Sequence, residues 1–183
     1  MTNFDKRTIQ RLRVPLGFLF AVVFLLFAKP TVISLAIGGG IAFIGLTIRA
    51  WASGHIKKAS VLAVTGPYAY TRNPLYVGSF IMGVGFTVAS NVWWLALLFI
   101  ALFIGIYLPV MRVESGDIRQ IFGEDFDEYE QNVPVFIPRL TPWKKAGGKF
   151  DFGLYLQYRE YRAFWGVIVA VGILAAKAYF LNQ

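Results

Sequence analysis

The stretch TGPYAYTRNPLYVGS, Thr65 to Ser79, is rich in turn-forming, aromatic and polar residues and stands between two strongly apolar runs. Unpaired backbone N–H and C=O groups in hydrocarbon each cost several kcal/mol, so irregular backbone does not face lipid. The stretch must therefore lie in water or line a cavity, while the apolar runs on either side of it determine the fold.

The composition of the whole chain indicates a membrane protein. Its 183 residues are 57% hydrophobic with a mean hydropathy of +0.58, above the apolar share of about 45–50% that is usual in soluble proteins. We expect an all-α, polytopic membrane helical bundle that forms a single domain. Its parts are two spans in 1–48, a core in 49–138 that contains the helical hairpin 75–111, and an interfacial helix with the last span in 139–183. The five runs long enough to approach a bilayer crossing are 14–28, 31–48, 75–90, 91–111 and 163–181.

The basic residues predict the orientation of these spans. Of the 18 Lys and Arg, four precede the first span, four lie between residues 49 and 72, and eight lie between residues 112 and 162. A cytoplasmic N-terminus would place all three basic groups in the cytoplasm, as the positive-inside rule expects. We therefore expect an integral membrane protein whose active site, built from residues 49–76 and 110–138, faces the cytoplasm. Nucleic acid is not an expected partner, because the basic residues are scattered over separate segments.

Several residues carry expectations about the packing and the ends of the helices. Asn91 should form the turn of the hairpin, and Gly123 should interrupt the helix that leaves the membrane after residue 111. Residues 150–165 place aromatic and apolar side chains at helical spacing, which predicts a helix in the membrane interface before the last span. The glycines expected to allow close helix packing are Gly38, Gly39, Gly40, Gly45, Gly78, Gly83 and Gly85.

The opening stretch also contains a candidate binding site. Arg72 and Asn73 stand directly before Pro74, a residue favoured in the first turn of a helix, and free N–H groups at a helix start attract anions. The turn at Gly66-Pro67 would bring Tyr68 and Tyr76 to either side of this charge. The alternative interpretation is an interfacial anchor, in which Arg72 reaches lipid phosphate and both tyrosines lie at headgroup depth.

Three further polar residues are candidates for chemistry. Glu114 ends a membrane run and is a candidate because the desolvation of a near-membrane carboxylate requires a partner, with Arg112 two residues before it; either could instead be an exposed charge. His55 either contacts substrate or is simply solvated. With no cysteine and one histidine, we expect no metal site built from these ligands. Arg72 would suit a carboxylate and Glu114 an ammonium or sulfonium, whose attraction to tyrosine faces adds to the site.

The residues GPYAYTRNPLYVG resemble the Gly-x-Tyr-x-x-x-Arg-His-Pro-x-Tyr-x-Gly signature of the isoprenylcysteine carboxyl methyltransferase and phospholipid methyltransferase superfamily. The later run ESGDIRQIFGEDFDEYEQNVPVFIP is similar to the glutamate, Phe-Gly, tyrosine and proline pattern of the same superfamily. The resemblance covers about residues 49–138. It implies an integral membrane methyltransferase that uses S-adenosylmethionine and releases S-adenosylhomocysteine.

The resemblance also assigns roles to positions. It implies a lipid or hydrophobic acceptor that enters sideways between helices. From their charge and position we expect catalytic roles for Glu114 and Arg112, and contacts of His55 and Arg112 with this acceptor. The residues that the resemblance implies for cofactor binding are Ser60, Val61, Leu62, Ala63, Tyr68, Arg72, Asn73, Pro74, Leu75, Tyr76 and Glu114.

This chain departs from the superfamily pattern at three positions. Asn73 replaces the usual histidine, Ser115 a second glutamate, and Val110 an arginine that binds substrate in the isoprenylcysteine branch. Arg112 is not equivalent to that arginine, because it lies about 200° around the helix from Glu114 at roughly 100° per residue.

The methyl acceptor therefore stays open among an isoprenylcysteine-like carboxylate, a phospholipid amine and a hydrophobic thiol. The alternatives to a methyltransferase are a membrane reductase that uses NADPH, like the sterol reductases, and a non-catalytic membrane scaffold.

Overall fold

The computed structural model describes residues 3–56, 61–144 and 148–181, without the side chains of residues 3–14 and 181. All regular elements in this described part are helical, as expected from the composition. They are α1 (Asn3–Phe27), α2 (Val32–Ser53), the 3₁₀ helix η1 (Gly66–Ala69), α3 (Pro74–Ser90), α4 (Trp93–Phe122), α5 (Glu124–Asn132), α6 (Phe152–Gln157) and α7 (Tyr161–Leu181).

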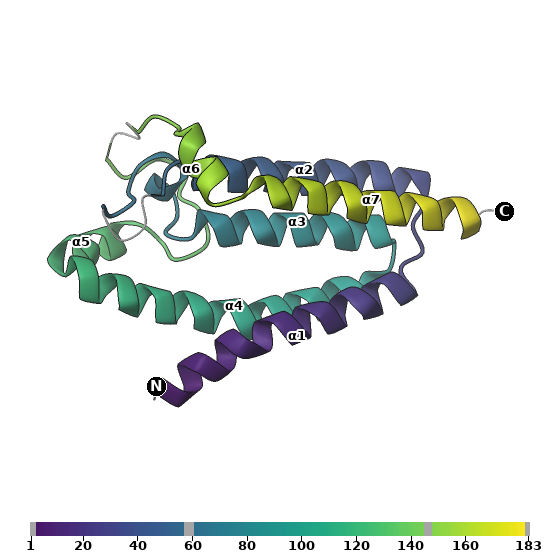
Figure 1. The fold of residues 1–183 in the computed structure, drawn as a ribbon, viewed down its shortest axis with the longest axis horizontal. Helices are drawn as coiled ribbons and strands as arrows, with labels where there is room; N and C mark the ends of the chain where they lie inside the picture. The colour runs from purple at the N-terminus through teal and green to yellow at the C-terminus, as the bar shows by residue number, and fades with distance from the viewer. Residues whose placement is uncertain (1–2, 57–60, 145–147, 182–183) are drawn as a thin grey trace.

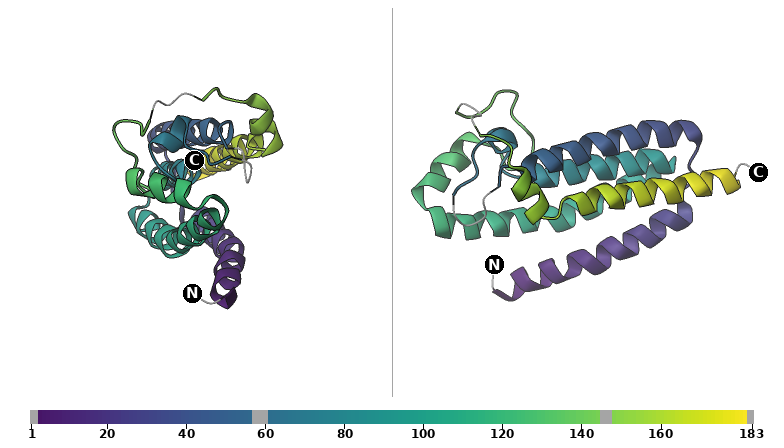
Figure 2. Two further views of the ribbon diagram at one scale, coloured as in Figure 1. Left: turned by 90° about the vertical axis from the view of Figure 1, so that its left-hand side faces the viewer. Right: turned by 45° about the horizontal axis from the view of Figure 1, so that its top comes forward.

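Three of these helices are long and apolar enough to cross a membrane: Val32–Ser53, Trp93–Phe122 and Tyr161–Phe180. Two shorter apolar helical segments, Pro15–Phe27 and Pro74–Ser90, accompany them. Helices α2, α3 and α7 run side by side, and α1 and α4 lie below them in Figure 1. The longer loops, η1, α5 and α6 gather at one end of the bundle, away from the C-terminus (Figures 1 and 2). Irregular backbone is thus concentrated at that end.

One helix extends further than expected, and two other helix ends lie where the sequence predicted them. The second span was expected to end at residue 48, but α2 continues to Ser53, so Arg49 is a helical residue rather than part of a connection. The fourth span continues from Trp93 through Glu114 to Phe122 and ends at Gly123, whose φ of 54° confirms the expected interruption. Asn91 adopts the left-handed conformation between α3 and α4, which confirms it as the turn of the hairpin. Arg112 and Glu114 therefore lie well inside one continuous helix.

The expected helix over residues 150–165 is wrong as a single element. It is divided into α6 and the start of α7 by Arg159, whose φ is 56°. This positive φ is incompatible with a continuous right-handed helix. The break brings Glu160 to the beginning of α7, where it contacts α2.

Helices α2 and α3 are joined by glycines that permit contact between their backbones. A Cβ atom on Gly45 would lie 2.5 Å from the carbonyl oxygen of Gly78, and one on Gly85 would lie 2.6 Å from that of Gly38. Small residues at such a seam allow close helix approach in membranes. The expectation was wrong for Gly39 and Gly40, since an added Cβ on either meets nothing within 4 Å.

The far end of the bundle is fastened by polar caps and an apolar cluster. Thr31 and Ser34 form a reciprocal capping box at the start of α2, and the Ser34 hydroxyl also donates to the carbonyl of Ala89, at 3.0 Å. These contacts satisfy backbone groups that a helix start and a helix end would otherwise leave unpaired. The buried cluster beside them joins α1, α3, α4 and α7 and consists of Phe24, Ala28, Ala89, Leu95 and Leu174.

Candidate functional site

The signature stretch forms a tight turn that leads into α3. Gly66 has a φ of +57°, a conformation that glycine adopts without steric cost, and Pro67 follows within η1. Pro74 begins α3 and is buried, while Asn73 precedes it without capping the helix through its side chain. The sequence therefore folds here into a 3₁₀ turn, a short extended segment and a proline-initiated helix.

The polar groups of this stretch are paired with a segment that we call the backing segment, residues 129–143. The Tyr129 hydroxyl donates to the carbonyl of Tyr68 at 2.7 Å, and Asn73 donates through Nδ2 to the carbonyl of Val135 at 2.9 Å. Irregular backbone is stable when such partners satisfy it. Four further bonds link the two segments: Arg72 N to Pro134 O, Thr71 Oγ1 to Phe136 O, Arg139 N to Tyr70 O and Trp143 N to Ala69 O.

Arg72 is held by a carboxylate of the protein itself. Its guanidinium forms an ion pair with Glu130, which also pairs with Arg119. The guanidinium carbon atoms of Arg72 and Arg119 lie 6.0 and 5.6 Å from the ring centre of Phe126, which is a cation–π geometry. Arg72 therefore fixes the loop against α4 and α5, and a ligand carboxylate would have to compete with Glu130 for it.

Tyr76 and Glu114 are brought together by α3 and α4. The Tyr76 hydroxyl donates to Oε1 of Glu114 at 2.8 Å, and the Tyr76 and Tyr107 ring centres are 5.4 Å apart. Glu114 is half-buried, so its carboxylate is both oriented by a neighbour and reachable. This pair combines a negative charge with two aromatic rings, a combination suited to a cationic group. Arg112 is exposed on the same helix, between the buried residues Met111 and Val113.

A cavity of about 700 Å³ lies at the loop end of the bundle. Three residues expected to bind cofactor, Val61, Leu62 and Ala63, line it together with His55. The imidazole Nδ1 of His55 lies 2.9 Å from the carbonyl oxygen of Trp51, and Nε2 lies 3.2 Å from that of Gly148. The opposite wall is formed by residues 148–154, and Ser60, also expected to bind cofactor, is outside the described residues.

Tyr68 is buried within η1, and its hydroxyl has no hydrogen-bond partner among the described residues. Burial raises the pKa of the Tyr68 phenol far above its usual value, with smaller contributions from Tyr129 and Glu160. The group is therefore neutral at physiological pH. A buried hydroxyl without a partner is costly unless a bound molecule or water completes it.

The structure also reveals a polar centre that the sequence reasoning missed. Arg49 of α2 pairs with Glu160, with 2.7 Å between Nη2 and Oε1 and 3.2 Å between Nε and Oε2. Its Nη1 donates to the Ser79 hydroxyl and to the carbonyl of Leu75, at 3.4 Å for the latter. The sequence did indicate that Arg49 would have a partner, because an arginine directly after an apolar run must offset the cost of its desolvation. The identity of that partner, 111 residues away, was not available from spacing.

The sites expected from sequence thus fall into three groups. Val61, Leu62, Ala63 and His55 share a cavity, Tyr76 and Glu114 form a pair, and Arg72 with Asn73 is tied to the backing segment. Pro74 and Leu75 form the first turn of α3. The backbone carbonyl of Leu75 accepts hydrogen bonds from the side chains of Ser79 and Arg49.

Comparison with known proteins gives relatives with two kinds of description. The nickel-cobalt-cadmium resistance protein NccN of Alcaligenes xylosoxydans xylosoxydans is 34% identical over 107 residues, covering 55% of this chain and 50% of the relative. The cobalt-zinc-cadmium resistance protein CzcN of Cupriavidus metallidurans is 33% identical over 112 residues, covering 59% and 49%. The chain therefore spans about half the length of these curated relatives.

A methyltransferase is also among the relatives. The protein-S-isoprenylcysteine O-methyltransferase of Schizosaccharomyces pombe is 30% identical over 84 residues, covering 46% of this chain and 36% of the relative. No solved structure matches the chain significantly. The family model for phospholipid methyltransferases matches residues 18–125, more than half of the chain, and so includes the signature stretch, Tyr76 and Glu114. The chain belongs to the phospholipid methyltransferase family.

Proposed function

We propose that this protein is an integral membrane methyltransferase that uses S-adenosylmethionine to methylate a lipid or another membrane-partitioned acceptor. The observation that carries the proposal is the placement of the cavity lined by Val61, Leu62 and Ala63 at the loop end of the bundle, where the signature stretch also lies. Its volume of about 700 Å³ is typical of small-molecule sites. Family membership supports the same activity.

We propose a five-span topology with the N-terminus and this loop end in the cytoplasm. The three long apolar helices and the two shorter apolar segments supply the spans. Most Lys and Arg residues precede the first span or lie in the segments near the loop end, which supports this orientation. A water-soluble cofactor would then reach the cavity directly from the cytoplasm.

The described residues fit the cofactor by their chemistry. The cavity wall combines apolar residues, suited to an adenine ring, with the polar side chains of His55, Thr65 and Asp151. The Tyr76–Glu114 pair offers a fixed carboxylate for a cationic group, and the unpaired Tyr68 hydroxyl offers a buried hydrogen-bonding group. Bound there, S-adenosylmethionine would supply an electrophilic methyl group: the acceptor atom would bond to the methyl carbon as the carbon–sulfur bond breaks, with the electron pair remaining on sulfur and any proton on the acceptor atom passing to water.

The role of the protein in this reaction is mainly positioning. The hydrogen bond from Tyr76 fixes the Glu114 carboxylate, and the backing segment fixes the backbone of residues 68–73. Preorganisation of this kind lowers the entropic part of the barrier. We propose that His55 contacts the acceptor or cofactor at the cavity wall and that Arg112, exposed on α4, acts on the acceptor head group or on nearby lipid phosphate.

The first test is calorimetric titration of the purified protein with S-adenosylhomocysteine, using Glu114→Gln and Tyr68→Phe as variants. Loss of the charged partner should weaken binding by about tenfold to a hundredfold, as expected for 1.5–3 kcal/mol. Tyr68→Phe should weaken binding while leaving stability unchanged or higher, because the lost hydroxyl has no described partner. Glu124→Gln, at an exposed position in the first turn of α5, is the matched control.

The same titration separates the methyltransferase from the two alternatives. A reductase would bind NADPH and not S-adenosylhomocysteine, and a scaffold would bind neither. Equal affinity of Glu114→Gln and the wild-type protein for S-adenosylhomocysteine would remove Glu114 from the site.

A further inference from the structure

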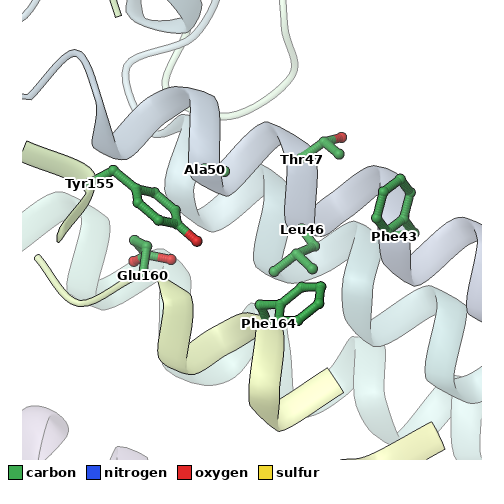
Figure 3. Close-up of a pocket in the computed structure, with 7 residues that line it drawn as sticks. All are labelled: Phe43, Leu46, Thr47, Ala50, Tyr155, Glu160 and Phe164. Atoms are coloured by element: carbon green, nitrogen blue, oxygen red, sulfur yellow. The ribbon is translucent and has the colours of Figure 1, made fainter. Parts of the chain in front are cut away.

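A second pocket lies between α2 and α7 and shares no lining residue with the cavity described above. It has a volume of about 150 Å³ and is lined by Phe43, Leu46, Thr47, Ala50, Tyr155, Glu160 and Phe164. Figure 3 shows Phe43, Leu46 and Phe164 toward one end and Tyr155 with Glu160 toward the other. The pocket is therefore amphipathic, with an apolar section along two membrane helices and a polar section at the loop end.

The polar section combines the negatively charged Glu160 carboxylate, a strong hydrogen-bond acceptor, with the neutral hydroxyl of Tyr155, which can both donate and accept. Arg49 is directed at Glu160, Ser79 and the carbonyl of Leu75, so its donor groups are already engaged. The Glu160 carboxylate receives bonds from Arg49, yet each carboxylate oxygen can accept more than one. A head group that donates a hydrogen bond would find an acceptor here, whereas a second carboxylate would face Glu160 with the Arg49 charge already neutralised.

This pocket adjoins the cavity proposed for the cofactor. Ala50 lines the pocket and Gly54 lines the cavity, and these two residues are about 6 Å apart along α2 at 1.5 Å per residue. On the other wall, Leu154 belongs to the cavity and the next residue, Tyr155, to the pocket. The cavity and the amphipathic pocket are thus lined by neighbouring residues of the chain, beside the Arg49–Glu160 pair.

We propose that the pocket between α2 and α7 binds the methyl acceptor next to its head group and selects a head group that donates a hydrogen bond, an alcohol, thiol or ammonium, over a carboxylate. Glu160 is the specificity-determining residue. The inference rests on the proposed function, and it adds a role for α7, which lies beyond the matched residues 18–125. The small volume accommodates only the part of the acceptor near its head group, while the remaining chain stays in lipid.

The test measures direct binding of three tritiated amphiphiles that share one alkyl chain: hexadecanol, hexadecylamine and palmitate. The full chain in phosphatidylcholine nanodiscs should bind the alcohol and the amine at least about tenfold more tightly than palmitate, a difference of about 1.4 kcal/mol. Glu160→Gln, which adds an amide donor, should narrow this difference by increasing palmitate binding. Equal affinity of the wild-type protein for palmitate and hexadecanol would overturn the proposal.

A matched pair of tryptophan variants tests the location. Thr47→Trp fills the pocket from an exposed position and should weaken hexadecanol binding by about tenfold. Ile44→Trp places the same ring on an exposed part of α2 outside the pocket lining and should bind like the wild type. Equal affinity of both variants for hexadecanol would overturn the assignment of the acceptor to this pocket. S-adenosylhomocysteine titration of the wild type, made separately, shows whether the proposed function itself fails.

Discussion

Helix α2 forms two different seams, one with α3 and one with α7. At the α3 seam, Gly45 and Gly78 allow backbone contact that leaves no room for a Cβ atom. At the α7 seam, Leu46 and Phe164 border a pocket, and the Arg49–Glu160 pair joins the helices beside it. A seam between backbones is fixed, whereas a seam between side chains and one ion pair can admit a ligand. The difference explains how one membrane helix can serve both the fold and a site.

The largest effect is expected at the α3 seam. Gly45→Leu should destabilise the protein by about 3 kcal/mol or more, because its Cβ would lie 2.5 Å from a backbone oxygen that cannot move aside. Thermal unfolding followed by circular dichroism in detergent measures the change. Gly39→Leu on the same helix, where an added Cβ meets nothing within 4 Å, is the control. A similar loss of stability in both variants would mean that the close contact at the α3 seam is not what makes Gly45 necessary.

A smaller effect is expected from the ion pair at the α7 seam. Arg49→Met should cost about 2 kcal/mol, because it leaves the partly buried Glu160 without its charged partner. Arg162→Met, at an exposed position on α7, is the control and should change stability little. A double-mutant cycle with Glu160→Gln measures the coupling of the pair. A coupling energy near zero would show that the pair does not fasten α7 to α2.

The smallest effect is expected from the apolar part of the α7 seam. Phe164→Ala should destabilise the protein by only about 1 kcal/mol, less than truncation of a fully buried phenylalanine, because Phe164 borders a pocket and is 38% exposed. Unfolding in detergent should be compared with that of Phe180→Ala, a 73% exposed position on the same helix. A loss as large as that of Gly45→Leu would mean that the two seams are equally fixed.

Much of the fold could be read from residue patterns. The apolar runs located the five apolar helices, since hydrophobic length reports directly on membrane crossing. Asn91 and Gly123 identified a turn and a helix break because their preferred backbone conformations are local properties. The helix break at Arg159 was missed, because arginine has no intrinsic preference for a positive φ and only the surrounding contacts impose it.

The candidate site was predictable only in part. Tyr76 was predicted from the signature stretch and Glu114 from its position at the end of a membrane run and from the resemblance. The structure brings the Tyr76 hydroxyl to 2.8 Å from the Glu114 carboxylate, while their roles stay predictions. The ion pair between Arg72 and Glu130 was not predicted, because charged residues near one another in sequence offered several possible partners. The pairing removes Arg72 as a free anion-binding charge in this structure, which spacing along the chain could not indicate.

The sequence by itself determined that the chain is a helical membrane protein with a polar signature stretch between apolar runs, because hydrophobicity and turn chemistry act locally. Tertiary structure alone decided that Gly45 and Gly78 form a closed seam while Leu46 and Phe164 border a pocket. It also decided that Arg49 meets Glu160 across 111 residues. Such contacts depend on which faces of distant helices meet, and this is set by packing and by the pairing of charges withdrawn from water.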